Sequence, residues 1–158
     1  MSQLNCYGTE RAFRIVVIQV RLGGLGIPKP WRAMLDSRPI RLLLTEDDAD
    51  TRDIVAYVLA QEGYAVTAVP DGQRALESMR EAPPDVAILD FLMPGLGGDE
   101  VVSAMQREPA LSLIPVISMT ASPPLLRQGR VAAVVQKPFG ILELVGTVRV
   151  VCADPSQR

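Results

Sequence analysis

Short apolar runs alternate with amphipathic stretches from residue 40 onward. Five runs have the length and the continuous hydrophobicity of strands buried on both faces: 40–44, 64–69, 86–89, 115–119 and 131–136. Four stretches repeat apolar residues at the three- and four-residue spacing of a helix: 49–62, 73–81, 99–107 and 141–148. Strands that alternate with crossover helices predict a single parallel sheet with helices on both faces.

The same spacing predicts which side of each helix is buried and how the strands are ordered. In the first helix, one face is expected to carry Ile54, Val55, Val58 and Leu59, and Gly63 stands where a helix C-terminus favours glycine. Five strands of this kind fit an α/β, flavodoxin-like (βα)5 fold, a doubly wound parallel sheet with strand order 2-1-3-4-5. In that order, ligands bind beyond the carboxyl ends of the first and third strands.

Charged and hydroxyl side chains gather at these strand ends: Glu46, Asp47 and Asp48 after the first strand, Asp90 at the third, Thr120 at the fourth and Lys137 at the fifth. Crowded carboxylates repel one another unless a cation offsets their charge, and oxygen ligands suit Mg²⁺. An Asp carboxylate beside Mg²⁺, a Lys and a hydroxyl can attack a phosphoryl group and form an aspartyl phosphate. A structural interpretation stays open for the acidic triplet, because acidic residues favour helix N-termini and Asp48 can simply cap the first helix.

Composition narrows the chemistry further. The 158 residues are 48% hydrophobic and 22% charged, as expected for one packed domain and not for a disordered chain. The chain has no histidine, which excludes Ser-His-Asp and Cys-His nucleophiles, His-ligated zinc and a role as phosphohistidine donor. Its two cysteines, Cys6 and Cys152, match no metal-binding spacing and indicate a reducing, cytoplasmic setting.

The charge pattern divides the chain near Pro39. Residues 1–39 carry six Lys/Arg and two Asp/Glu, a net of +4, whereas residues 40–158 carry ten and sixteen, a net of −6. We therefore expect a basic N-terminal arm over 1–39, either flexible or an artefact of start assignment, a globular domain over 40–152 and a short tail over 153–158. The net charge of −2 argues against direct nucleic-acid binding, and the apolar run at 15–20 is too short for a membrane anchor.

Four segments, in order and on the expected strands, carry a resemblance to a known family. They are LLLTEDD at 42–48 followed by Arg52, LDFLMPGLGG at 89–98, SMTA at 118–121 and KPF at 137–139. The separations are 43 residues from Asp47 to Asp90 and 30 from Asp90 to Thr120. Together, over about residues 40–152, they resemble the receiver domain of a two-component response regulator.

The resemblance implies a role for each matching residue. Asp90 would be the phosphoacceptor, and the Mg²⁺ ligands would be Glu46, Asp47, Asp90 and the backbone carbonyl of Leu92. Thr120 would be the switch hydroxyl and Lys137 the cation that pairs with the phosphoryl group, followed by a cis peptide at Pro138. The resemblance implies a signalling phosphoacceptor and not an enzyme, with a sensor histidine kinase or phosphotransfer protein upstream and an effector protein downstream.

The chain also departs from the family pattern. Only 17 positions separate Thr120 from Lys137, so we expect a truncated fourth helix, and the family's aromatic switch position falls on Val134. Because the sequence ends at Arg158, we expect a stand-alone receiver that passes its signal to another protein. Two alternatives remain: a receiver-like interaction module that works without phosphorylation, and an aspartyl phosphatase or mutase. The second is disfavoured because Leu92 stands where such enzymes use an acid/base Asp.

Overall fold

The computed structural model describes residues 38–121 and 131–153. These residues form five strands and four helices, in chain order β1 (Arg41–Thr45), α3 (Ala49–Gln61), β2 (Ala65–Val69), α4 (Gly72–Glu81), β3 (Val86–Asp90), α5 (Gly98–Arg107), β4 (Val116–Thr120), β5 (Ala133–Gln136) and α6 (Ile141–Ala153). The predictions for 1–39, for the fourth helix and for most of the tail fall at least partly on residues outside these ranges.

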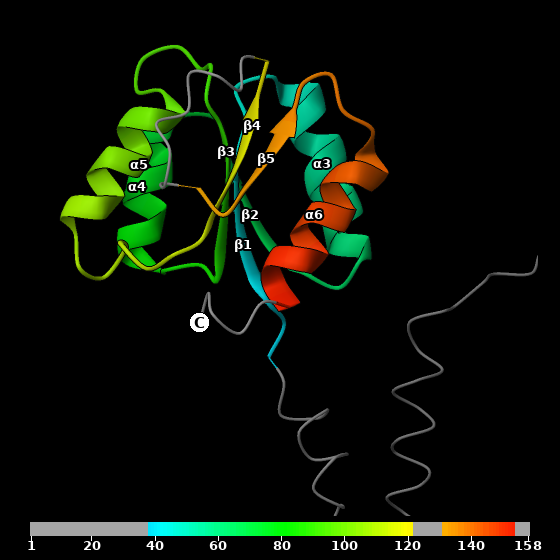
Figure 1. The fold of residues 1–158 in the computed structure, drawn as a ribbon, viewed down its shortest axis with the longest axis horizontal. Helices are drawn as coiled ribbons and strands as arrows, with labels where there is room; N and C mark the ends of the chain where they lie inside the picture. The colour runs from blue at the N-terminus through cyan, green and yellow to red at the C-terminus, as the bar shows by residue number, and fades with distance from the viewer. Residues whose placement is uncertain (1–37, 122–130, 154–158) are drawn as a thin grey trace, which may run out of the picture. The chain divides into compact units, whose positions relative to one another are not determined.

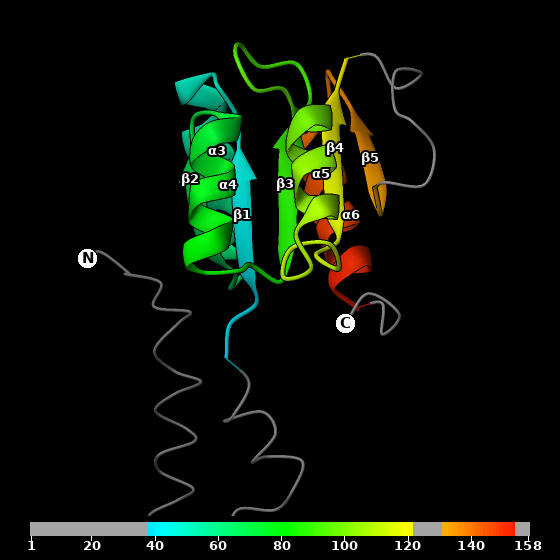
Figure 2. The same cartoon turned by 90° about the vertical axis from the view of Figure 1, so that its left-hand side faces the viewer.

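The strands make one sheet in the order β2-β1-β3-β4-β5, and each neighbouring pair is parallel. Figures 1 and 2 show α3 and α6 on one face of the sheet and α4 and α5 on the other. The predicted flavodoxin-like fold and its strand order are therefore confirmed. The order reverses between β1 and β3, which places their carboxyl ends at the position where this class of fold binds ligands.

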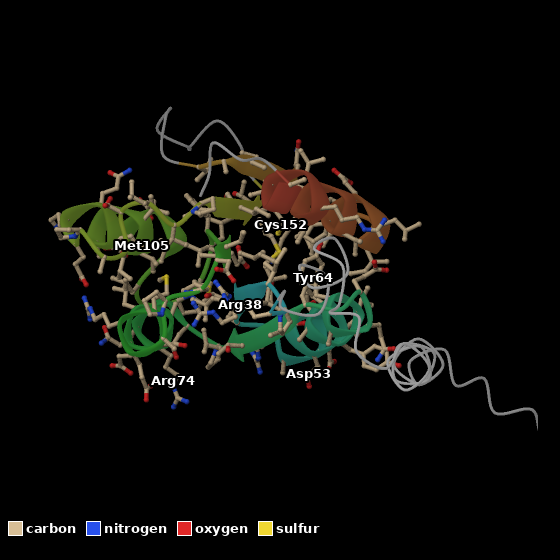
Figure 3. All side chains as sticks on the ribbon, turned by 90° about the horizontal axis from the view of Figure 1, so that it is seen from below. Arg38, Asp53, Tyr64, Arg74, Met105 and Cys152 are labelled. Atoms are coloured by element: carbon tan, nitrogen blue, oxygen red, sulfur yellow. The ribbon has the colours of Figure 1, made fainter. Side chains whose placement is uncertain are left out.

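Each face of the sheet has its own apolar core. Along β1, Leu42 and Leu44 pack toward α3 and α6, while Leu43 packs toward α4 and α5, as expected for a strand whose side chains alternate between two covered faces. Figure 3 shows the two layers from below, with Met105 in one and Cys152 in the other. Burial on both faces explains why the central strands read as uninterrupted apolar runs.

The elements lie where the apolar pattern predicts them, but one core position was wrong. Ile54 is 61% exposed, whereas Val55 and Leu59 are buried. At about 100° per residue, Ile54 lies about 140° around the helix from Leu59, outside the stripe that faces the sheet. Gly63 follows α3 with φ of 92°, the left-handed conformation expected at its C-terminus.

Among the described residues, no helix is both long and apolar enough to cross a membrane.

Candidate functional site

The residues singled out at the strand ends meet at one edge of the sheet, the upper edge in Figure 1. Parallel strands bring their carboxyl ends to the same side, so residues far apart in sequence become neighbours. Backbone hydrogen bonds fix the relative heights of the three later strands: Phe91 N donates to Met119 O at 2.9 Å, and Lys137 N donates to Thr120 O at 2.8 Å. The positions of Asp90, Thr120 and Lys137 are thereby set by the sheet itself.

Lys137 is the centre of this cluster. Its Nζ donates to Asp90 Oδ2 at 2.6 Å and to Glu46 Oε2 at 2.7 Å. The two carboxylate side chains are only 4% and 2% exposed, and that of Lys137 is 27% exposed. Charge-assisted hydrogen bonds that are this short and shielded from solvent are among the stronger polar interactions in a protein. One ammonium group therefore links the ends of β1, β3 and β5.

The third acidic residue, Asp47, completes a group with the oxygen donors that a hard divalent cation prefers. One carboxylate oxygen from each of Glu46, Asp47 and Asp90 can be chosen so that all three lie within 4.8 Å of one another. Asp47 is exposed, unlike its two partners, so the group is open to solvent on one side. An acidic cluster of this composition fits Mg²⁺, which usually keeps several of its waters.

Burial and the neighbouring charged groups shift the pKa values of Glu46 and Lys137. Burial raises the pKa of its carboxyl group and the nearby charge of Asp90 raises it further, against the lowering effect of the Lys137 hydrogen bond. Burial alone would lower the pKa of Lys137, but its bonds to Asp90 and Glu46 outweigh burial and leave it raised. The raised pKa of Lys137 favours its charged form, and a further cation near Glu46 would stabilise the ionised form of that carboxyl group.

The loop after β3 carries the predicted ligand Leu92. Its backbone N–H donates to Asp90 Oδ1 at 2.9 Å, so both oxygens of Asp90 accept a hydrogen bond. The Leu92 side chain is 54% exposed beside the site. The proposed use of its carbonyl as a metal ligand stays a prediction, as does the switch role of Thr120, which is buried at the end of β4.

Two residues close to Glu46 and Asp47 bond to the backbone of the turn between β1 and α3 and of the first turn of α3. Asp48 caps α3, because its Oδ1 accepts from Thr51 N at 2.8 Å, which confirms the structural interpretation of that residue. Arg52, to which the sequence assigns no role, donates from one guanidinium nitrogen to the carbonyls of Glu46 at 2.8 Å and Asp47 at 3.3 Å. The only sequence signal for this contact is a basic residue one turn into a helix that follows an acidic turn.

Three further features considered in the sequence can be located in the structure. The Lys137–Pro138 peptide bond is cis, as the family resemblance implies. Val134, at the position of the family's aromatic switch residue, is 41% exposed on β5. The cysteine in the described part of the chain, Cys152, is buried in α6 and makes no disulfide.

Comparison with known proteins agrees with this geometry. The family model described as "Response regulator receiver domain" matches residues 42–149. The DNA-binding response regulator MtrA of Mycobacterium tuberculosis is 30% identical over 120 residues, which cover 73% of this chain and 51% of MtrA. The transcriptional regulatory protein CseB of Streptomyces coelicolor is 44% identical over 80 residues, 51% of this chain and 33% of CseB. The chain thus spans about half or less of the length of these curated relatives.

Solved structures extend the likeness to the whole described fold. The chemotaxis protein CheY4 of Vibrio cholerae superposes with a TM-score of 0.67 at 28% identity, covering 72% of this chain and 99% of CheY4. A putative response regulator from Chloroflexus aurantiacus gives a TM-score of 0.69 at 27% identity, covering 74% of this chain and all of that one. Since the family model matches well over half of the chain and the fold is that of solved receivers, the protein belongs to the response regulator receiver domain family, a signalling module of two-component systems.

Proposed function

We propose that this receiver accepts a phosphoryl group on Asp90 in a reaction that depends on Mg²⁺, and signals to a partner protein through the resulting change of conformation. The observation that carries the proposal is the buried Asp90 carboxylate, held by Lys137 at 2.6 Å beside a second carboxylate from the neighbouring strand. A structural ion pair needs one acid, whereas two buried acids bonded to one lysine, with a third carboxylate beside them, favour a site for a further cation and an anionic ligand.

Asp90 would act as the nucleophile. One of its carboxylate oxygens forms a bond to phosphorus, and the bond from phosphorus to the donor's leaving group breaks, with the electron pair staying on the leaving group. The donor would be the phosphohistidine of a sensor kinase or phosphotransfer protein, or a small phosphodonor. Lys137, already within hydrogen-bond distance of Asp90, would stabilise the charge on the phosphoryl oxygens.

Mg²⁺, when bound by the carboxylates of Glu46, Asp47 and Asp90 and by the carbonyl of Leu92, would neutralise and orient the phosphoryl oxygens. The chain's own residues then hold the product. The hydroxyl of Thr120 would donate to a phosphoryl oxygen, and the β3–α5 loop would reposition around it. A partner that binds one arrangement better than the other would read the change as a shift in population.

One observation favours an alternative, a receiver-like interaction module that works without phosphorylation. Val134 offers no aromatic ring to couple Thr120 to the surface of β5, although the site residues themselves are present. The presence of Asp90 and Lys137 in one cluster with Glu46 and Asp47 favours the phosphoacceptor over this alternative.

Intact mass spectrometry tests the proposal. The full chain is incubated with Mg²⁺ and a small-molecule phosphodonor, with and without a chelator, beside Asp90→Asn and the matched control Asp53→Asn, an exposed α3 carboxylate. We expect a single phosphoryl adduct in the wild type and in D53N, and none in D90N or with the chelator. A folded wild-type protein that forms no adduct would overturn the proposal in favour of the interaction module.

A further inference from the structure

The side chain of Asp47 has no support of its own. Glu46 and Asp90 are buried and bonded to Lys137, but Asp47 is exposed, and none of the hydrogen bonds or ion pairs described for this part of the chain involves its carboxylate. Its direction therefore depends on the backbone of the turn between β1 and α3. A metal ligand that swings freely loses conformational freedom on binding and weakens the site.

Arg52 holds that backbone. Its guanidinium donates to the carbonyls of Glu46 at 2.8 Å and Asp47 at 3.3 Å, the two peptide groups that lead into and out of Asp47. Hydrogen bonds fix the backbone that carries Arg52, because Asp48 caps the helix by accepting from Thr51 N and Arg52 N donates to Asp48 O at 2.9 Å. The helix is anchored one turn later by buried Val55.

The contacts of Arg52 differ from those of Lys137 in one informative way. Lys137 bonds to carboxylates, whereas the hydrogen bonds described for Arg52 go to carbonyl oxygens. As a positive charge near the cluster, Arg52 would oppose the binding of a second cation. By fixing the turn between β1 and α3, Arg52 would favour the binding of that cation. The two effects have opposite signs, so the sign of a measured change separates them.

We propose that Arg52 is a positioning residue for the metal site, which fixes the turn that presents Asp47 and Glu46 and thereby strengthens Mg²⁺ binding. The inference rests on the proposed function only in that the acidic cluster takes up Mg²⁺. Part of the Mg²⁺ affinity would then come from Arg52, in the first turn of α3, in addition to the contribution of the ligands themselves. Partners that orient ligands in this way are typically worth about 10- to 100-fold in metal affinity.

Isothermal titration of the full-length protein with MgCl₂ at fixed ionic strength tests the inference without any phosphodonor. Two variants are compared with the wild type: Arg52→Lys keeps the charge but loses the paired contacts, and Arg52→Gln loses the charge. The matched control is Arg74→Gln, which removes an exposed arginine near the N-terminus of α4 that pairs with Asp71 at 3.6 Å. Circular dichroism in chelator shows that each variant is folded.

We expect both Arg52 variants to raise the Mg²⁺ dissociation constant by about 10-fold and the control to leave it unchanged. If R52Q binds Mg²⁺ as tightly as the wild type or more tightly, the positioning role is overturned. If R52Q does not fold, R52K decides, and a wild-type affinity of R52K for Mg²⁺ overturns the positioning role. A merely structural role would lower thermal stability without changing the dissociation constant. A wild type that binds no Mg²⁺ would instead overturn the metal dependence of the proposed function.

Discussion

Alanine in place of Gly72 should destabilise the fold, whereas the same replacement at Gly146 should stabilise it. A Cβ atom at Gly72, the first residue of α4, would stand 2.3 Å from the carbonyl oxygen of Leu96 and 2.7 Å from Cγ2 of Val101. A Cβ at Gly146, in the middle of α6, would meet nothing within 4 Å. Both glycines are helical, so the comparison isolates the close approach of α4 to the β3–α5 loop.

The magnitudes follow from these contacts. Replacing a helical glycine by alanine in open space gains about 1 kcal/mol of unfolding free energy, through the entropy of the unfolded chain and helix propensity. Overpacking costs about 1–3 kcal/mol, and the upper end applies at Gly72 because a backbone carbonyl cannot rotate away as a side chain can. At about 4 °C per kcal/mol for a domain of this size, G146A should raise the melting temperature by about 4 °C and G72A should lower it by about 8–12 °C.

Thermal and urea unfolding followed by far-ultraviolet circular dichroism measure both variants, with chelator present so that metal binding does not contribute. Equal melting temperatures for G72A and the wild type would refute the argument, because they would mean that the loop carrying Leu96 moves aside at no cost. A destabilised G146A would refute the assignment of open space around α6.

Three further results are expected. The pKa of Glu46 is raised in the folded state, so the folded state is favoured most when this carboxyl group is protonated, and the metal-free protein should lose stability as pH rises through that pKa. Glu46→Gln should flatten this part of the plot of melting temperature against pH. An unchanged plot would count against the burial argument. Leu92→Asn should speed loss of the phosphoryl adduct from Asp90, followed by mass over time, because an apolar side chain beside the site hinders an attacking water; an unchanged rate would refute that reason. Glu108→Gln, which breaks the exposed pair with Arg80 at 2.5 Å, should lower the melting temperature slightly at low salt and not at high salt, and a salt-independent loss would contradict screening.

The sequence predicts the sheet and the meeting of Asp90 with Lys137 for a single reason. Apolar runs reveal buried parallel strands, and parallel strands bring their carboxyl ends together whatever the side-chain details. The exposure of Ile54 follows from helical geometry only once Val55 and Leu59 are known to define the buried stripe, because the apolar pattern alone does not show which of the neighbouring apolar residues centre on the sheet. The contact of Arg52 with two carbonyls depends on its rotamer and on the path of the turn, neither of which leaves a periodic trace in the sequence.

The position of Lys137 affects how tightly a divalent ion can bind to the acidic cluster. The ammonium group of Lys137 already bonds to the oxygens of Glu46 and Asp90, so an incoming ion competes with it for these two carboxylates. What a titration measures is then the difference between two attractions to the same carboxylates, and this difference is smaller than the attraction of the incoming ion alone. The arrangement favours modest affinity, so the occupancy of the proposed Mg²⁺ site should follow the free Mg²⁺ concentration around the protein.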